Sequence, residues 1–345
     1  MKNFEEEILK ALNEKIFPGA ALLVASKGEI LYRQFFGHAT LLPHPEPLTE
    51  KTIFDIASLS KPIATASLAL TAKHEKGLSL NAAACKYLSA LNDEDKKKIT
   101  IHHLLKHTSG LPAWKPYYEE IAREHPEVVG KRSSRSYYLE KISGESLETP
   151  VGNQRVYSDL GFILLGILLE DFWQTTLDQL FREKIAGPLE LKDTFYVPVG
   201  ARPPRPYESF AATEDSRWRK KIIRGEVHDD NAYTLGGVTG HAGLFSTVDD
   251  LHRFLITFKK EKEAVKLKLG WDTPSEGSSQ AGRYFSKNSI GHLGYTGCSF
   301  WMDLEQDFHI ILLTNRVHPS AQNEAIKKFR PRIHDLIYEE LIKKT

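Results

Sequence analysis

A serine and a lysine lie three residues apart in the segment Ala57-Ser58-Leu59-Ser60-Lys61-Pro62. On a helix, residues at this spacing project from the same face, so the Ser58 hydroxyl and the Lys61 ammonium would be neighbours. A serine hydroxyl becomes a useful nucleophile only when a base takes its proton, and a poorly solvated lysine can act as that base or assist another group. The pair therefore predicts nucleophilic catalysis, with Ser58 as the nucleophile and Lys61 involved in proton transfer.

The flanking sequence predicts a helix that begins at this pair. Pro62 lacks an amide hydrogen and therefore belongs in the first helical turn. Gly77 follows a basic last turn, which is typical of a helix C-terminus. We expect a helix of about five turns over residues 58–76. Apolar residues flank the pair, so Lys61 would be carried towards a core, where a charge without a function is costly.

The composition limits the possible functions. The chain has 345 residues, 41% hydrophobic and 26% charged, which allows one large core or two coupled lobes. Its 46 Lys and Arg residues balance 45 Asp and Glu residues, so no electrostatic feature indicates binding to nucleic acid or to a membrane surface. Cys85 and Cys298 lack metal-ligand spacing, and His102, His103 and His107 lack a suitably spaced carboxylate. We expect no metal and no cofactor.

The N-terminal segment does not resemble a secretory signal. It carries Glu5, Glu6 and Glu7 where such a signal would carry basic residues. No run of about 18 apolar residues indicates a membrane span. We therefore predict a cytoplasmic protein, provided that no signal peptide has been removed from the sequence. No pattern in the sequence indicates an oligomeric state.

The order of the expected elements predicts the fold class. Strand-like runs lie at 20–26 and 29–37 and again at 294–303 and 309–315, with mainly helical sequence between them. This order favours an antiparallel sheet completed from both ends of the chain, with an inserted helical lobe, in the α/β (α+β) class.

Finer expectations concern the boundaries within this single domain of residues 1–345. The α/β lobe would comprise about 1–75 plus 236–345, and the helical lobe about 76–235. The polar residues 120–146 are expected to form surface loops. A closing helix is expected from about Pro331.

Two further motifs lie far from Ser58 in the sequence. Tyr157-Ser158-Asp159 precedes an apolar segment, and His292-Leu293-Gly294 precedes Tyr295-Thr296-Gly297. With Ser58-x-x-Lys61, in this order and approximate spacing, they resemble the penicillin-recognising serine hydrolases, the group of class C β-lactamases, DD-peptidases and family VIII esterases. The resemblance extends over nearly the whole chain. It implies a β-lactamase/transpeptidase-like fold, in which helices flank an antiparallel sheet.

The resemblance also implies a role for each motif. Ser58 would be acylated, Lys61 and Tyr157 would share the proton transfers, and the backbone N–H groups of Ser58 and Tyr295 would hold the oxyanion. A phenol is a base near neutral pH only when its anion is stabilised, which a close lysine cation can do. The alternative for Tyr157 is a core aromatic residue before a helix.

The third motif departs from the family pattern. β-Lactamases and DD-carboxypeptidases of this group usually have Lys-Thr-Gly where this chain has His292, Leu293 and Gly294. Histidine is only partly charged near pH 7 and leucine offers no hydroxyl, so we expect weaker binding of a substrate carboxylate. This variant resembles the esterase and D-aminopeptidase members. We assign a catalytic role to His292 and substrate binding to Gly294; the alternative for His292 is an ordinary strand residue.

Two further residues are candidates for substrate binding. Asp159 stands where many relatives have asparagine, and an ionised carboxylate would accept a hydrogen bond from a substrate amine or hydroxyl. Alternatively, Ser158 or Asp159 caps the helix that follows. His241 lies in a glycine-rich turn and is either a cleft residue or a buried histidine.

The sequence therefore predicts a serine hydrolase that forms an acyl-enzyme on Ser58 and acts on small esters, amides or short peptides, D-amino acid derivatives among them. A peptidoglycan DD-carboxypeptidase or weak β-lactamase is one alternative. A catalytically lapsed binding or assembly protein of the same fold is another, but the presence of Ser58, Lys61 and Tyr157 together argues against it. We expect a small-molecule or short-peptide partner, no nucleic acid and no membrane span.

Overall fold

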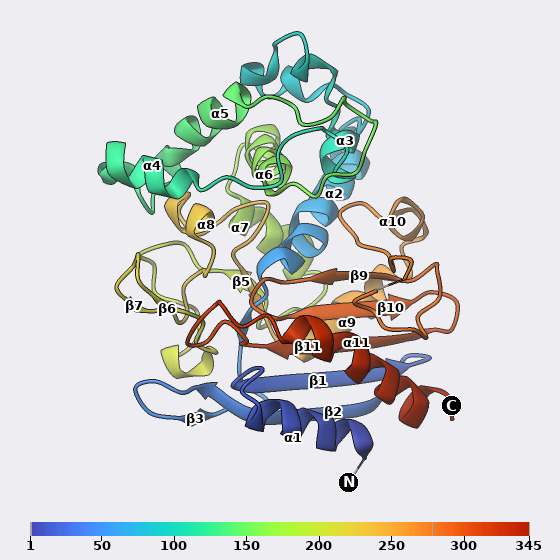
Figure 1. Cartoon of the computed structure of the whole chain (residues 1–345). Coiled ribbons are helices and arrows are strands. Elements are labelled where there is room, and N and C mark those ends of the chain that lie inside the picture. Colours follow the sequence, from blue (N-terminus) through green and yellow to red (C-terminus); the bar gives the residue numbers. More distant parts are fainter. Residues whose placement is uncertain (1, 278, 345) are drawn as a thin grey trace.

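The largest sheet of the protein is assembled from both ends of the chain. The computed structural model describes residues 2–277 and 279–344. The strands of this sheet are β1 (Gly19–Ser26), β2 (Glu29–Thr40), β3 (Glu46–Pro47), β9 (Ile290–Leu293), β10 (Ser299–Asp303) and β11 (Phe308–Thr314). Their order is β3-β2-β1-β11-β10-β9, and every neighbouring pair is antiparallel (Figure 1). The pairing of β1 with β11 confirms the predicted antiparallel sheet.

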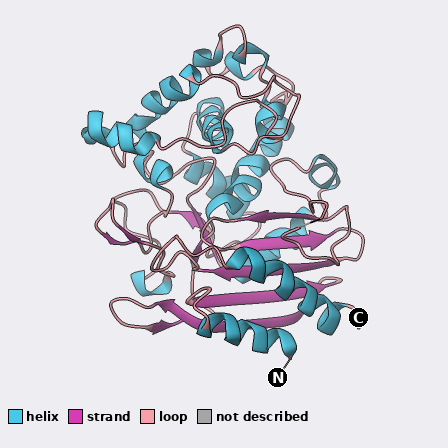
Figure 2. Ribbon diagram, in the orientation of Figure 1, coloured by secondary structure: helices cyan, strands magenta, loops and turns pink. Residues whose placement is uncertain are grey.

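Both faces of this sheet are covered by helices. Successive residues of a strand point to opposite faces, and every residue of β1 is buried. Leu23 packs into the core that includes α9 (Val248–Phe258), whereas Leu22 packs into the core formed with α1 (Asn3–Asn13) and α11 (Ile326–Ile337). Figure 2 shows α1 and α11 in front of the strands.

Short strands form two smaller sheets that are separate from this one. β4 (Phe54–Asp55), β8 (Leu244–Ser246) and β5 (Phe195–Tyr196) form a three-stranded sheet in the order β4-β8-β5. β6 (Asp215–Ser216) pairs with β7 (Lys221–Ile222). Because β4 leads directly into the segment that contains Ser58, this small sheet fixes where that segment begins.

The middle of the chain is mainly helical and lies above the large sheet in Figure 1. Its most buried helix is α6, in which every residue from Leu160 to Glu170 is buried. The helices outside the sheet layers are α2 (Ser67–Lys76), α3 (Ile101–Leu105), α4 (Tyr117–Glu124), α5 (Arg135–Gly144), α6 (Asp159–Trp173), α7 (Leu177–Phe181), α8 (Asp230–Thr234) and α10 (Lys262–Leu267). The division of the chain into two lobes at about residues 75 and 236 stays a prediction.

Three boundaries differ from the expectations. The polar region 120–146 forms parts of α4 and α5 instead of loops, because Ile121, Tyr138 and Ile142 are buried and anchor these helices. The closing helix α11 begins before Pro331, since Ile326 and Phe329 are buried against the sheet. The strand expected to begin at residue 294 is a turn followed by β10.

The helix after Ser58 has the predicted extent but an irregular first part. A 3-10 turn over Ala57–Leu59 leads into a π-helical segment over Lys61–Ala66 and then into α2. Pro62 has no amide hydrogen to donate, which is consistent with this departure from α-helical hydrogen bonding. The end is as predicted, because Gly77 has the left-handed conformation, with φ of 70°.

No single helix among the described residues combines the length and the apolar composition needed to cross a bilayer. α6 and the helical segment Leu177–Ala186 satisfy that test only together, and they meet at an angle of 78°.

Candidate active site

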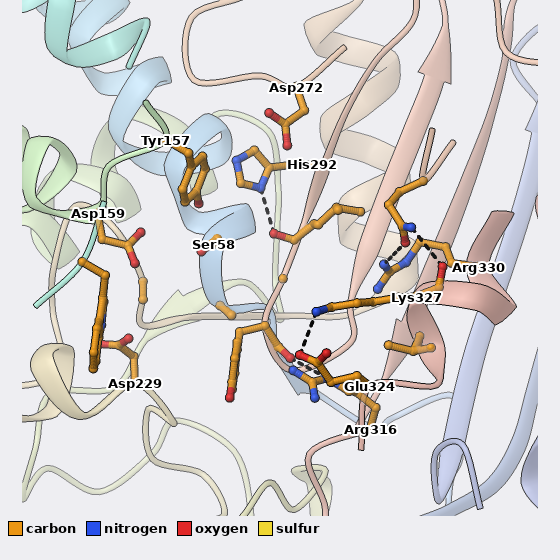
Figure 3. A pocket seen from close by; sticks show the side chains of 18 of the residues that line it. Ser58, Tyr157, Asp159, Asp229, Asp272, His292, Arg316, Glu324, Lys327 and Arg330 are labelled. Carbon is orange, nitrogen blue, oxygen red and sulfur yellow. Dashed lines mark hydrogen bonds and ion pairs between the residues drawn. The ribbon is translucent and has the colours of Figure 1, made fainter. Parts of the chain in front are cut away.

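Residues from all three sequence motifs meet at one cleft of about 970 Å³. Ser58 lies at the start of its helix, Tyr157 and Asp159 come from the loop and first turn of α6, and His292 comes from β9 (Figure 3). The cleft is also lined by Gly294, Tyr295, Trp114, Tyr118, Arg155, Glu214, His228, Asp229, Asp230 and Asp272, among others.

Lys61 is the centre of the hydrogen bonding around Ser58. Its side chain is fully buried, and its Nζ donates to Ser58 Oγ at 2.9 Å and to the backbone oxygen of His241 at 2.9 Å. Asp159 Oδ1 lies 2.6 Å from the same nitrogen. Burial disfavours the ammonium, but Asp159, with a smaller contribution from Tyr157, outweighs it and raises the pKa of Lys61 to about 12. Lys61 is therefore a cation at neutral pH.

Tyr157 lies beside Lys61 in a buried position. Lys61 Nζ is 4.9 Å from the centre of the Tyr157 ring. Burial raises the pKa of Tyr157 to about 12; the Lys61 cation lowers it and the Asp159 anion raises it further. At rest Tyr157 is a neutral phenol next to a charged lysine.

Ser158 and Asp159, which are neighbours in the second motif, have different roles. Ser158 caps α6, because its Oγ accepts from the backbone N–H of Gly161 at 3.1 Å and donates to the backbone oxygen of Pro112 at 2.7 Å. Asp159 is the first residue of the helix, and its carboxylate faces the cleft and Lys61 as an ion pair rather than an aligned hydrogen bond. The cap is thus Ser158, and Asp159 contacts the lysine.

His292 is neutral in the cleft. Its Nδ1 lies 3.0 Å from the backbone oxygen of Leu293, which requires a hydrogen on Nδ1 and leaves a lone pair on Nε2. Among the described residues, Nε2 has no hydrogen-bond partner. Burial lowers the pKa of His292 to about 4, with Asp272 acting in the opposite direction. The position that carries a lysine in many relatives therefore offers no positive charge at pH 7.

The turn after β9 lies against the chain segment that precedes Ser58. A Cβ on Gly294 would lie 2.7 Å from the backbone oxygen of Ile56, so only glycine fits this approach. Thr296 Oγ1 donates to the backbone oxygen of Asp55 at 2.7 Å. These contacts hold the backbone of Tyr295, whose side chain is 57% exposed, near that of Ser58.

His241 is buried behind the cleft. Its side chain is 1% exposed, and it is absent from the described residues that line the cleft. His241 Nε2 lies 3.0 Å from Asp229 Oδ1, and Nδ1 lies 3.0 Å from Thr239 Oγ1. Burial raises the pKa of Asp229, but His241, the backbone N–H of Ala232 and His228 together outweigh burial and hold that pKa well below its usual range. The contact of His241 with the predicted machinery is through its carbonyl oxygen, which accepts from Lys61.

Two residues at the site were not identified from the sequence. Asp55 accepts from the backbone N–H groups of Ala57 at 2.8 Å and His228 at 2.6 Å, and so connects the nucleophile segment to another wall of the cleft. A single carboxylate within the apolar run Ile53-Phe54-Asp55-Ile56 was a usable signal for it. His107, which stacks on Tyr157 at 4.5 Å, had no such signal.

The described residues contain no group of three or more His, Cys, Asp or Glu side chains arranged to hold a metal ion. They do contain a hydroxyl that is hydrogen-bonded to an ammonium, and a phenol ring whose centre lies 4.9 Å from that ammonium. This arrangement can support transfer of an acyl group to Ser58.

Comparisons with known proteins agree with this geometry. The model of the Beta-lactamase family matches residues 4–330. N-acetylmuramyl-L-alanine amidase of Bacillus subtilis (strain 168) is 32% identical, over 88% of this chain and 78% of the relative. A protein of Salmonella heidelberg (strain SL476), provisionally named D-alanyl-D-alanine carboxypeptidase, is 29% identical over 90% and 81% of the two chains.

Solved structures show the same fold. EstCE1, described as a hydrolase with promiscuous acyltransferase activity, superposes with a TM-score of 0.73 at 19% identity, over 97% of both chains. A class C β-lactamase superposes with a TM-score of 0.71 at 18% identity, over 96% of both chains. The β-lactamase/transpeptidase-like fold expected from the sequence is thus confirmed. The chain belongs to the β-lactamase family and is a serine hydrolase of that family.

Proposed function

We propose that this enzyme hydrolyses small esters or amides through an acyl-enzyme on Ser58. The observation that carries the proposal is the 2.9 Å contact between Lys61 Nζ and Ser58 Oγ at the bottom of a cleft that Tyr157 also lines. The nucleophile is thus hydrogen-bonded to a cation, and the ring of a titratable phenol lies 4.9 Å from that cation.

In this proposal Lys61 is the cation and Tyr157 is the base. An ammonium has three N–H groups, and that of Lys61 faces three oxygens, on Ser58, His241 and Asp159. It has no free lone pair to take a proton. The reactive form of Tyr157 is therefore its phenolate, which arises when the resting phenol releases its proton to solvent and which the Lys61 charge stabilises. This phenolate is the acceptor for the Ser58 proton.

The reaction then proceeds in two acyl transfers. Ser58 Oγ forms a bond to the substrate carbonyl carbon while its proton passes to the Tyr157 oxygen. The carbonyl oxygen takes up the negative charge and is held by the backbone N–H groups of Ser58 and Tyr295. Tyr157 returns the proton to the departing alcohol or amine as its bond to the carbonyl carbon breaks. Water then forms a bond to the acyl carbon while one of its protons passes to the Tyr157 oxygen. Tyr157 gives that proton to Ser58 Oγ as the bond between Ser58 Oγ and the acyl carbon breaks and the acid leaves.

The substrate class that we favour is an amide derived from peptidoglycan. The relative with 32% identity is named as an N-acetylmuramyl-L-alanine amidase. In the mechanism proposed above, Tyr157 can protonate the amine that leaves when an amide bond is broken. Removal of a C-terminal D-alanine is the second candidate, because the relative with 29% identity is provisionally named for it. The neutral His292 argues against the second candidate, since it lacks the charge that recognises a carboxylate at that motif.

The first test is intact-protein mass spectrometry after incubation with a fluorophosphonate and, separately, with a penicillin. We expect a fluorophosphonate adduct on the wild type and none on Ser58→Ala. An adduct that persists in Ser58→Ala would move the nucleophile elsewhere, and no adduct on the wild type would refute the proposed function. A long-lived penicilloyl adduct would favour the carboxypeptidase candidate.

The second test separates the substrate classes. N-acetylmuramyl-L-alaninamide, a peptide ending in D-alanyl-D-alanine and a p-nitrophenyl ester are incubated with the wild type and with Ser58→Ala, and the products are quantified by mass spectrometry. The amide cap leaves no free carboxylate on the first leaving group, so it suits the neutral His292. We expect Ser58-dependent release of L-alaninamide from the first substrate at a higher kcat/KM than release of D-alanine from the second. The reverse order would make the enzyme a carboxypeptidase.

A further inference from the structure

His107 is a buried side chain with no role in the three motifs. It is 2% exposed and follows α3 in the left-handed conformation, with φ of 58°. Its imidazole lies between two aromatic rings. The ring centre of Tyr157 is 4.5 Å away at an interplanar angle of 28°, and that of Phe162 is 4.9 Å away at 30°.

The same residue holds the backbone on both sides of Tyr157. The backbone N–H of Val156 donates to the carbonyl oxygen of His107 at 2.8 Å. The backbone N–H of Ser158 donates to His107 Nδ1 at 3.0 Å. Because one residue fixes the chain before and after Tyr157 and also contacts its ring, the direction of the phenol depends on His107.

The hydrogen bonding determines which form of the imidazole is present. Nδ1 accepts a hydrogen bond, so the hydrogen of the neutral ring is on Nε2. Burial, followed by the charge of Lys61, lowers the pKa of His107 well below its usual value; Arg155 and His292 act in the same direction. A protonated ring would lose the Ser158 contact and place a second cation near Lys61.

His107 Nε2 is also buried without a hydrogen-bond partner among the described residues. An apolar ring would fill the same space without leaving an unpaired donor, so packing alone does not account for a histidine here. What an apolar ring lacks is the acceptor for the Ser158 N–H.

We propose that His107, in its neutral form, is a positioning residue that fixes Tyr157 for proton exchange with Ser58. The inference rests on the proposed function, in which Tyr157 is the base. It adds a residue from the end of α3 to the site and requires both a flat ring and a hydrogen-bond acceptor at this position.

Three variants separate these two requirements. His107→Asn keeps an acceptor and tolerates the left-handed backbone, His107→Phe keeps a ring without an acceptor, and His107→Ala has neither. Each is compared with the wild type by the rate constant for fluorophosphonate labelling of Ser58, counted per folded molecule. His102→Ala is the matched control, because His102 lies on α3 itself and its contacts among the described residues are with Leu80, His103 and Lys106, none of them in a motif.

We expect His107→Ala to slow labelling on the order of a hundredfold, the scale associated with a small misplacement of a catalytic group. His107→Asn should recover part of this loss through its acceptor and His107→Phe part of it through its ring, and neither should reach the wild-type rate. For ester hydrolysis the effect should appear in kcat with little change in KM. The pH dependence of the labelling rate should also shift, because the loss of the imidazole changes the surroundings, and so the pKa, of Tyr157.

The possible outcomes are distinct. Labelling of folded His107→Ala at the wild-type rate would overturn the inference while leaving the proposed function intact, and so would a lower melting temperature with unchanged kcat and pH profile. Equal rates for His107→Phe and the wild type would also overturn it, since the acceptor would then be unnecessary. No labelling of the wild type would refute the proposed function itself.

Discussion

The charge on Lys61 depends on a residue that differs from the family pattern. The resemblance to that family leads us to expect asparagine at position 159, where this chain has an aspartate whose carboxylate lies 2.6 Å from Lys61 Nζ. A buried ammonium is disfavoured by desolvation, so an anion at this distance has a large influence on which groups carry protons. The pKa of Lys61 and that of Tyr157 are both raised by the Asp159 charge.

Replacing Asp159 by asparagine should therefore shift the pH dependence of acylation. Asn has no charge, so the pKa values of Lys61 and Tyr157 should both fall. A base whose pKa falls is deprotonated at lower pH, so the rising limb of rate against pH should move down by about one pH unit. Stopped-flow labelling of Asp159→Asn across pH 6 to 10 measures the shift.

A control for this experiment is Glu324→Gln. Glu324 also lines the cleft, but it pairs with Lys327 rather than with Lys61. This variant should keep the wild-type pH profile. If the rising limb of Asp159→Asn stays in place or moves to higher pH, the assignment of Tyr157 as the base is wrong.

At the scale of elements, the start of α6 determines where the proton-transferring residues stand. The helix is buried from Leu160 to Glu170, so its position is fixed by packing on all sides. Its N-terminus lies at the cleft, and the Ser158 hydroxyl links that end to the preceding loop by a hydrogen bond to the backbone oxygen of Pro112. Ser158 is thus structural, whereas Tyr157 and Asp159 line the cleft.

The variant Ser158→Ala should lower the free energy of unfolding by about 1–2 kcal/mol, because it removes a buried cap. The backbone N–H of Gly161 and the carbonyl oxygen of Pro112 would both lose a partner. Urea unfolding followed by circular dichroism measures the change.

The matched control is Thr176→Ala at the N-terminus of α7. Thr176 occupies the corresponding cap position but makes no side-chain cap hydrogen bond. It should change the free energy of unfolding by only a few tenths of a kcal/mol. Equal losses in both variants would show that the Ser158 hydroxyl is not what stabilises α6.

At the scale of the whole molecule, the sequence predicts what depends on local pattern and order. The apolar run that becomes β1, the glycine that ends α2 and the order of the three motifs can all be read from the residues. Together these patterns predict that Ser58, Lys61 and Tyr157 meet at one site, as they do in the cleft.

What the sequence does not predict depends on contacts between distant segments. Tyr138 and Ile142 lie in a region of mainly polar sequence, yet their burial stabilises the helix α5. Pro331 indicates a helix start, but the burial of Ile326 and Phe329 extends α11 before it. The place of His107 beside Tyr157 follows from tertiary packing alone, so no local pattern reveals it.

The size of the cleft leads to a prediction about the acyl group. At about 970 Å³ it lies near the upper end of the range for small-molecule sites, so a small ester would leave much of it empty. Trp114 lines this cleft and is 47% exposed, which is unusual for so large an aromatic side chain. Its indole ring is available to pack against a sugar ring on the substrate.

We therefore expect N-acetylmuramyl-L-alaninamide to be hydrolysed with a higher kcat/KM than N-lactoyl-L-alaninamide, which has the same amide bond but no sugar. Trp114→Ala should reduce that ratio by about fivefold to tenfold, the scale of one aromatic contact. Tyr207→Ala is the control, since Tyr207 is 51% exposed but is not among the described residues of the cleft. A ratio that is unchanged in Trp114→Ala would place the acyl group elsewhere, because only contact with the sugar distinguishes the two substrates.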